Sequence, residues 1–209
     1  MYLPEHFEER DSREIAQIIQ QFPLAVIVCV NGKEIIANHI PLMINRKNEL
    51  IGHIAKSNNL HQIIENNTKM LAIFSAENSY ISPNLYPTKQ ETHRHVPTWN
   101  YQVIHVHGFI TFIHVKKQKV AIVGKLTKLY EQEFSGKKAW RMSDAPKDYM
   151  EDMIENIVAF KIKIESICAK SKLSQNREQR DFDAVSCAMR DTGKNTLYNA
   201  MARRGISKI

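Results

Sequence analysis

One long segment limits the fold more than any other part of the chain. From Tyr101 to Val115 the side chains alternate with a period of two, the repeat of a β-strand. One face carries Val103, His105, His107, Phe109, Thr111 and Ile113, and the other carries Ile104, Val106, Gly108, Ile110 and Phe112. Both faces are largely apolar, so neither suits water. The segment predicts a central strand, or a strand with one face against a partner chain.

Shorter β segments surround this strand. Leu24–Val30 is apolar and β-branched, and Asn31-Gly32 after it is a strong hairpin signal. Further strands are expected at residues 34–44, 50–55, 69–76 and 160–165. The first four strands follow one another closely, which predicts an antiparallel meander. Barrel closure is a common way for such a sheet to remove its edges.

Helical periodicity occupies most of the remaining chain. Asp11 is placed to cap a helix from Ser12 to Phe22, with Glu14 at the third position of a capping box. Further helices are expected at about 58–66, 117–133, 150–158, 181–190 and 195–204, the second of these presenting Val120, Val123, Leu126, Leu129 and Tyr130. The sequence therefore predicts the α+β class, mainly β, with peripheral helices.

The charge and the cysteines suggest partners and a compartment. A formal charge of +7 favours an anionic partner such as nucleic acid or a phosphate-bearing cofactor, although a solvated basic surface explains it equally well. Cys29, Cys168 and Cys187 are odd in number and widely spaced, which excludes a disulfide framework. No signal pattern and no run of ~18 apolar residues is present. We expect a cytoplasmic protein without a membrane segment.

Unusual side chains gather in the aperiodic segment 79–100 and just after it. In residues 96–101, Thr98 and Asn100 offer short hydrogen-bonding groups, while Trp99 and Tyr101 offer flat apolar area with a polar edge. These are the parts that a planar heteroaromatic ring requires. The residues alone favour the simpler interpretation that Trp99 and Tyr101 anchor a loop to the core.

A second candidate site lies in residues 52–59, where a strand ends and a short helix begins. Free backbone N–H groups, Lys56 and Ser57 are placed there to meet a phosphate. The ordinary alternative is a junction capped by Asn58 or Asn59 with a solvated lysine.

Histidines are the third candidate. His93 and His95, and His105 and His107, have the i, i+2 spacing that points both rings to one face of a strand. Zinc or haem iron uses such rings, but no cysteine or carboxylate pair stands nearby at ligand spacing. We therefore expect core or interface histidines and no metal site.

Common enzyme motifs are missing. The sequence has no nucleophile elbow, no Walker-type loop and no Gly-x-Gly-x-x-Gly, so a nicotinamide Rossmann domain is not expected.

The last two helices have the length of a helix-turn-helix, and five Lys or Arg face one acid in the last twenty residues. The favoured interpretation is a helical hairpin that packs on the barrel through Val185, Met189, Leu197 and Met201.

Several blocks in order along the chain resemble one family. They are Gly52-His53-Ile54-Ala55, Ile81-Ser82-Pro83, Tyr86-Pro87-Thr88-Lys89, Val96-Pro97-Thr98-Trp99-Asn100-Tyr101, His105-Val106-His107-Gly108, Asp144-Ala145-Pro146 and Lys172-Leu173-Ser174-Gln175-Asn176-Arg177. Together they resemble the PaiB family of FMN-binding negative transcriptional regulators. The chain departs from that family where Phe109–Lys119 lacks a tryptophan, and where Ala159-Phe160 is bulky and relatives tend to have glycine.

The resemblance implies an FMN-binding split β-barrel and a homodimer with FMN at the subunit interface. It implies that His53, Ala55, Lys56 and Asn58 serve the phosphate and ring edge. It also implies that Trp99, Asn100 and Tyr101 line the isoalloxazine and that Lys172, Ser174, Gln175 and Asn176 complete the pocket, with the partner chain as one source of the last four.

The expected function is that of a bacterial, cytoplasmic FMN-binding protein of the PaiB type, a negative transcriptional regulator. The alternatives are a flavin-dependent oxidoreductase and a haem-binding or haem-degrading split barrel. Nucleic acid is a further candidate partner. We expect a flavin-binding domain over residues 1–177 and a helical C-terminal appendage over residues 178–209.

Overall fold

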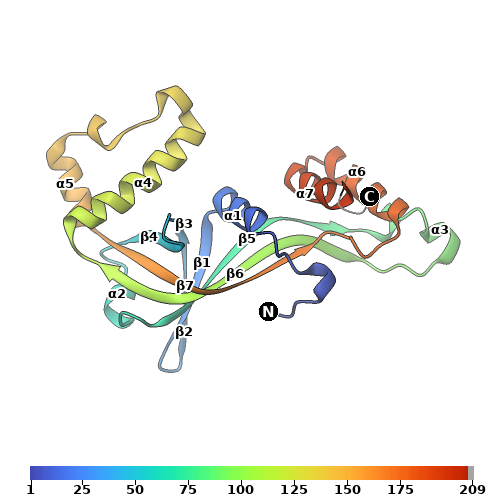
Figure 1. The fold of residues 1–209 in the computed structure, drawn as a ribbon, viewed down its shortest axis with the longest axis horizontal. Helices are drawn as coiled ribbons and strands as arrows, with labels where there is room; N and C mark the ends of the chain where they lie inside the picture. Colours follow the sequence, from blue (N-terminus) through green and yellow to red (C-terminus); the bar gives the residue numbers. More distant parts are fainter. Residues whose placement is uncertain (207–209) are drawn as a thin grey trace. The chain divides into compact units, whose positions relative to one another are not determined.

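The computed structural model describes residues 1–206 of the 209-residue chain (Figure 1). The chain forms two compact units. Unit 1 comprises residues 1–15, 75–105 and 168–206, and unit 2 comprises residues 16–74 and 106–167. This division does not follow the expected boundary at residue 177, and the separation of 1–177 from 178–209 stays a prediction.

Seven strands form one sheet with the order β2-β1-β5-β6-β7-β4-β3. Their bounds are β1 Leu24–Asn31, β2 Glu34–Pro41, β3 Met43–Ile44, β4 Glu49–Ala55, β5 Lys69–Ile81, β6 Thr98–Ile113 and β7 Ile157–Lys172. β6 lies between β5 and β7, which confirms the central strand. Within residues 1–206, hydrogen bonding does not close the sheet between its outermost strands, β2 and β3.

The predicted meander is wrong in two respects. β5 pairs with β1 and β6, not with β4. Among the described strands, β4 has no hydrogen-bonded ladder with β2 or β5, and it pairs antiparallel with β7 over seven residues, from Glu49 opposite Lys163 to Ala55 opposite Ile157. β7 also runs far beyond the predicted range of 160–165. The short connections led to the prediction that strands adjacent in sequence would pair. The long β7 instead provides a complete ladder of hydrogen bonds for β4.

The first hairpin forms as predicted. β1 and β2 pair from Leu24 opposite Pro41 to Asn31 opposite Glu34, so Gly32 and Lys33 make the connection. Gly32 has a φ of +61°, a conformation that costs glycine little. The return strand then ends at Pro41, and β3 follows as a separate short strand.

The core of unit 2 explains the unusual bulk at Phe160. Phe160 is fully buried and lies opposite Gly52 in the β4–β7 pair. A Cβ atom on Gly52 would lie 3.0 Å from Phe160 Cζ and 2.7 Å from Leu42 Cδ2. Gly52 therefore makes the room that Phe160 fills, and the phenyl ring of Phe112 packs on it edge-on at 6.4 Å.

The long helices lie close to their predicted ranges. The elements are η1 Glu5–Phe7, α1 Ser12–Gln21, α2 Leu60–Ile63, η2 Pro83–Leu85, α3 Lys89–Thr92, α4 Lys116–Ser135, η3 Gly136–Lys138, η4 Met142–Asp144, α5 Lys147–Glu155, α6 Gln179–Asp191 and α7 Asn195–Ile206. The expected apolar face of α4 is partly wrong, because Val120 is exposed whereas Ile122 and Leu126 are buried. Residues 79–100 are more regular than expected, because β5, η2, α3 and β6 reach into them.

β6 has one fully buried face and one partly covered face. Every second residue from Asn100 to Phe112 is buried, including Gln102, Ile104, Val106 and Ile110. The residues between them are only half-buried in the single chain. The largely apolar second face is thus left incompletely covered.

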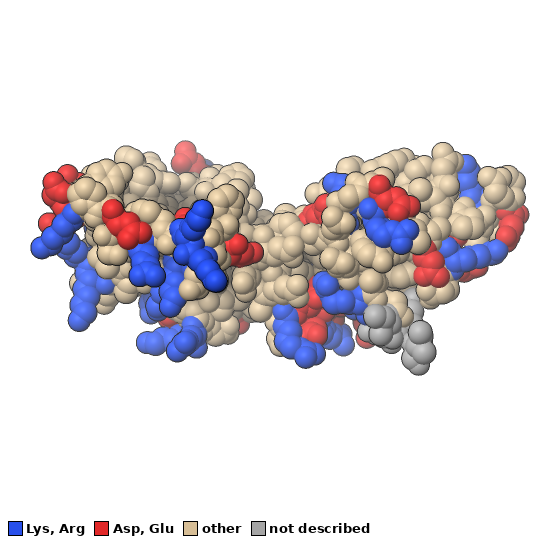
Figure 2. Space-filling view, turned by 90° about the horizontal axis from the view of Figure 1, so that it is seen from above, with Lys and Arg blue, Asp and Glu red and all other residues tan. Residues whose placement is uncertain are grey.

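Positive charge is unevenly spread over unit 2. Lys and Arg side chains gather over the part of unit 2 that carries α4 and α5 (Figure 2). None of the helices in residues 1–206 combines the length and the hydropathy that a membrane span requires.

The C-terminal helices form a packed hairpin in unit 1. Val185, Met189, Leu197 and Met201 are all at most 3% exposed. They share one apolar cluster with residues of β5 and of the segments after β5 and β7, namely Ile81, Tyr86 and Leu173. These contacts confirm the predicted helical hairpin.

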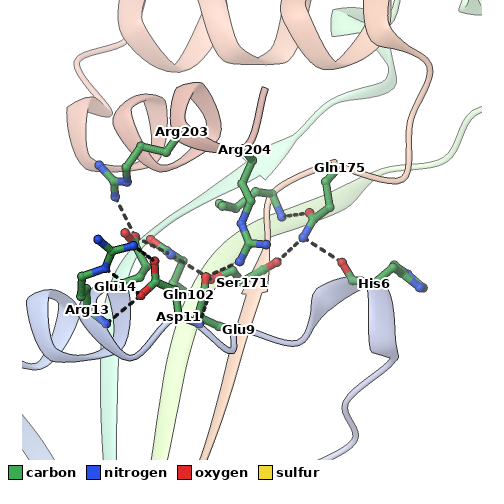
Figure 3. Close-up of polar contacts among 11 residues, drawn as sticks. His6, Glu9, Asp11, Arg13, Glu14, Gln102, Ser171, Gln175, Arg203 and Arg204 are labelled. Atoms are coloured by element: carbon green, nitrogen blue, oxygen red, sulfur yellow. Dashed lines mark hydrogen bonds and ion pairs between the residues drawn. The ribbon is translucent and has the colours of Figure 1, made fainter. Parts of the chain in front are cut away.

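A buried polar network joins α7 to the N-terminal segment of unit 1 (Figure 3). Glu9 is 7% exposed, and its carboxylate accepts hydrogen bonds from Ser171 Oγ at 3.1 Å and from the Arg204 guanidinium. Gln102 Nε2 donates to Ser171 Oγ at 2.9 Å.

The predicted cap of α1 forms only in part. Arg203 donates to Glu14 Oε1 at 2.7 Å, so Glu14 pairs with α7 instead of closing the expected capping box. Arg13 N donates to Asp11 Oδ1 at 2.9 Å, which confirms Asp11 as the cap.

Candidate functional site

An exposed pair of aromatic rings lies where β5 ends and β6 begins. Trp99 is 51% exposed and Tyr80 is 50% exposed. Their ring centroids are 5.9 Å apart and the planes meet at 72°, an edge-to-face contact. Aromatic area that is open to solvent makes this pair a candidate surface for a flat ligand.

Lys172 binds the backbone of this aromatic segment. Its Nζ donates to Trp99 O at 2.6 Å and to Thr98 Oγ1. Burial, and then the nearby charges of Lys170 and Arg177, lower the pKa of Lys172. Lys170 Nζ in turn lies 5.5 Å from the centroid of the Tyr101 ring. An anion bound beside these cations would relieve the repulsion among them.

Asn100 and Ser174 are buried and bind each other. Ser174 Oγ donates to Asn100 Oδ1 at 3.0 Å, and Ser174 has a φ of +63°. Gln175 accepts from Leu173 N at 2.7 Å and donates to Ser171 O at 2.6 Å. These side chains hold the segment after β7 in its turn, whereas Asn176 is exposed. The structure therefore brings the 98–101 and 172–176 predictions together within unit 1.

The remaining predicted residues lie in unit 2, at the end of β4. His53 is half-buried, and its Nδ1 is a buried atom without a hydrogen-bond partner among residues 1–206. Burial lowers the pKa of His53. A buried ring nitrogen without a partner is costly unless a ligand or water satisfies it, so His53 Nδ1 is a candidate ligand contact.

The turn after His53 differs from the expected phosphate cradle. Lys56 N donates to Asn156 O at 2.8 Å, Asn58 N donates to Ala55 O at 2.9 Å, and Leu60 N donates to Asn58 Oδ1 at 3.0 Å. Those backbone donors are already used. Ala55 and the side chains of Lys56 and Ser57 are exposed, so an anion here would be held by side chains. Asn58 Nδ2 donates to Asn38 Oδ1 at 2.8 Å and fixes the turn.

His95, a member of the first histidine pair, lies in a polar network of unit 1. His95 Nε2 lies 2.7 Å from Thr88 Oγ1, whose hydroxyl donates to the Asp181 carboxylate at 2.7 Å. The His95 ring also packs on Tyr86, with centroids 4.9 Å apart. Across residues 1–206, no three His, Cys, Asp or Glu side chains are grouped as a metal site would require.

A groove along α4 is a feature that sequence reasoning missed. Its volume is about 930 Å³, and residues of unit 2 line it: Met43, Ile44, Asn45, Arg46, Lys47, Glu49, Ile51, Thr111, Phe112, Ile113, Gln118, Ala121, Ile122, Lys125, Lys128, Leu129, Gln132 and Lys161. We call it the α4 groove. Its residues come from β3, β4, β6, β7 and α4, and no short motif carries such a combination. The sequence offered one signal for it, a helical face with residues spaced by three or four positions: Gln118, Ala121, Lys125, Lys128 and Gln132.

Replacing His53 with glutamine is expected to reduce the loss of stability in acid. The pKa of His53 is lowered in the folded chain. Near pH 6.5 His53 therefore binds a proton in the unfolded chain but stays neutral in the folded chain. The free energy of unfolding therefore falls as the pH drops through that value. Urea unfolding at about pH 7.5 and about pH 5.5 should show a smaller decrease for His53→Gln than for wild type. Equal decreases would show that His53 does not cause the loss of stability at low pH.

Comparison with known proteins gives consistent results. A sequence-family model described as "Putative FMN-binding domain" matches residues 1–166. The chain is 32% identical over 185 residues to the Protease synthase and sporulation protein PAI 2 of Bacillus subtilis, an alignment that covers 87% of this chain and 86% of that protein. It is 28% identical over 155 residues to the uncharacterized protein YKL070W of Saccharomyces cerevisiae, covering 64% and 90%. Similar proteins thus occur outside bacteria.

Among solved structures, the FAD and heme binding protein of Mycobacterium smegmatis resembles this chain with a TM-score of 0.58 at 12% identity. The match covers 79% of this chain and 73% of that one. Identity this low shows a shared fold alone. The shared architecture is the split β-barrel with helices, which confirms the predicted α+β class.

Proposed function

Because the chain belongs to the PaiB family and matches the model described as "Putative FMN-binding domain", we propose that it binds FMN without a covalent bond. The observation that carries the proposal is that a chain of this family presents two groups of side chains suited to FMN. One group is the exposed Trp99 with Lys172 beside it, and the other is His53 with the free Lys56. Each group offers a contact that the chain itself does not use.

The isoalloxazine is the part of FMN that suits the Trp99 group. Trp99 and Tyr80 offer flat apolar area, and Tyr101 lies beside the cation of Lys170. Stacking of a heteroaromatic ring on an exposed indole contributes about 1–3 kcal/mol. In this proposal Asn100 and Ser174, with Gln175, position the segment and do not touch the ring, because their polar atoms already bind one another or the backbone.

The phosphate and the polar edge of FMN suit the His53 group. The exposed ammonium of Lys56 and the hydroxyl of Ser57 have no hydrogen-bond partner among residues 1–206, and both bind phosphate well. His53 Nδ1 is buried and lacks a partner, so it fits a flavin or ribityl group at hydrogen-bond distance. Ala55 leaves the approach open because its side chain is small.

We propose that FMN lies at the interface of a homodimer. The support is the second face of β6, where Val103, His105, His107 and Phe109 are only half-buried in one chain. A partner chain would cover this half-buried strip of apolar and histidine side chains. In such a dimer, one chain supplies the His53 group and its partner supplies the group that contains Trp99 and Lys172.

We further propose a role in negative regulation that does not depend on DNA contacts by the C-terminal helices. The name of the Bacillus subtilis relative refers to protease synthesis and sporulation. The described cations of the last twenty residues all lie beside carboxylates: Arg190 beside Asp191, Lys194 beside Glu77, Arg203 beside Glu14 and Arg204 beside Glu9. A neighbouring carboxylate partly neutralises each of these cations and so weakens its attraction to phosphate. The three free thiols support a cytoplasmic location.

A flavin-dependent oxidoreductase is the second candidate. The observation that favours it is the exposure of Trp99 and Tyr80, which leaves room for a second molecule above a bound ring. FMN supplies hydride or single-electron transfer when bound. Reduction of bound flavin by NADPH with turnover on an acceptor would support the enzyme. A Soret band on addition of haemin, without any response to FMN, would favour the haem-binding alternative.

Loss of either group is expected to weaken FMN binding. Titration by flavin fluorescence should give a Kd about tenfold higher for Trp99→Ala, because stacking is lost, and about tenfold higher for Lys56→Ala, because a phosphate contact is lost. Matched controls are Trp140→Ala and Lys117→Ala, which remove an exposed residue of the same type outside both groups. If the Kd changes in neither Trp99→Ala nor Lys56→Ala, both groups are assigned wrongly.

A further inference from the structure

The α4 groove combines an apolar floor with a cationic rim. Ile51, Phe112 and Ile122 are at most 8% exposed and form the floor together with the partly buried Met43, Ile113 and Leu129. Its volume of about 930 Å³ lies within the range of small-molecule sites. None of the eleven residues predicted for FMN lines it, so it is a separate feature of unit 2.

The rim is strongly positive. Arg46, Lys47, Lys125, Lys128 and Lys161 line the groove, against one acid, Glu49. Glu49 is already engaged, because Asn45 Nδ2 donates to it at 2.9 Å and Lys161 Nζ donates to it at 2.9 Å. These hydrogen bonds, with the charges of Lys161 and Lys47, lower the pKa of Glu49 and keep it ionised.

Three cations of the rim are uncompensated. Arg46, Lys125 and Lys128 have no carboxylate within 4.0 Å among the residues that the structure describes. Lys125 and Lys128 lie on the same face of α4 as Ala121 and Leu129, so their charges stand directly above apolar surface. The absence of neighbouring acids keeps the potential of the groove positive.

We propose that the α4 groove binds a small carboxylate with a hydrocarbon body. The hydrocarbon would lie on the floor formed by Ile51, Phe112 and Ile122, and the carboxylate would meet Lys125, Lys128 and Arg46. A neutral apolar molecule would leave the cations unused, and a small inorganic anion would leave the floor exposed. The combination therefore selects an amphipathic organic anion.

The test uses the whole chain with 8-anilinonaphthalene-1-sulfonate as fluorescent probe and decanoate as competitor. Decanoate is expected to displace the probe, while decanol, which has the same chain without the charge, competes about tenfold more weakly.

The double substitution Lys125→Glu with Lys128→Glu should raise the Kd of decanoate about tenfold or more. Its control, Lys117→Glu with Lys138→Glu, makes the same charge change outside the groove and should leave the Kd within about twofold. Ala121→Trp should fill the groove and remove decanoate binding.

FMN titration of the same variants separates this site from the flavin site. FMN affinity is expected to stay unchanged in Ala121→Trp and in the double substitution at Lys125 and Lys128. Four results would overturn the proposal: no displacement by decanoate, equal competition by decanol, equal losses in the two charge variants, or loss of FMN binding with the groove variants. Dissociation of a dimer by Ala121→Trp would also overturn it, since a second copy would then occupy the groove.

Discussion

Gly108→Ala is expected to lower the free energy of unfolding by about 3 kcal/mol or more. A Cβ atom on Gly108 would lie 2.4 Å from the carbonyl oxygen of Lys163 and 2.7 Å from Ile162 Cγ2. Both neighbours belong to β7, the strand beside β6 at the centre of the sheet. A backbone carbonyl in a ladder cannot move aside as a flexible side chain can, so the two strands would have to separate.

The matched control is Gly124→Ala, the same chemical change in α4. A Cβ atom there has Met142 Sδ at 3.6 Å as its nearest neighbour, an ordinary contact. Alanine in a helix interior should raise stability by about 0.5–1 kcal/mol. Guanidinium unfolding of the two variants and wild type measures both effects. Similar stabilities for the two variants would show that β6 and β7 do not approach as closely as described.

Glu9→Ala is expected to lower the free energy of unfolding by about 3 kcal/mol, because it removes the buried carboxylate of an ion pair whose cation is partly exposed. The Glu9 side chain is 5% exposed and accepts hydrogen bonds from Arg204 and Ser171. Its loss leaves the guanidinium of Arg204 and the hydroxyl of Ser171 with too few partners. Because Arg204 lies in α7, the last helix should lose its attachment to the N-terminal segment first.

Glu8→Ala provides the control next to it in sequence. Glu8 pairs with Arg10 near the surface, at 2.5 Å, where such a pair contributes about 0–1 kcal/mol. Guanidinium unfolding measures the total effect, and hydrogen exchange measures the amides of α7 separately. An unchanged exchange rate in α7 of Glu9→Ala would mean that the network does not hold this helix.

Local patterns in the sequence predicted most of the elements. Asn31-Gly32 marked the first hairpin, the stripe of Ile15, Ile18 and Ile19 marked α1, and alternation marked β6. Val185, Met189, Leu197 and Met201 marked the buried sides of α6 and α7. In each case the signal and the structure span the same few residues, so local chemistry was sufficient.

Pairing over long distances could not be predicted in the same way. The position of β4 beside β7 depends on Gly52 opposite Phe160, two residues more than one hundred positions apart. The polar network of Glu9, Ser171 and Arg204 likewise joins both ends of the chain. Neither the strand pairing nor the polar network produces a regular spacing in the sequence, because the partners become neighbours only after folding.

The candidate site was predictable in its positions but not in its chemistry. Family resemblance indicated Trp99, Lys172 and His53, whereas local reasoning alone favoured a structural Trp99. The exposure of the indole, the lysine bound to its carbonyl oxygen and the unpartnered Nδ1 of His53 appear only in three dimensions. The α4 groove was missed because its floor and rim come from five separate elements.

Native mass spectrometry of the purified chain mixed with excess FMN tests flavin binding most directly. The expected result is a dimer that carries two FMN molecules, from which denaturation releases unmodified FMN because no covalent bond forms. The contradicting result is a chain that unfolds cooperatively, and is therefore folded, yet carries no flavin at any FMN concentration.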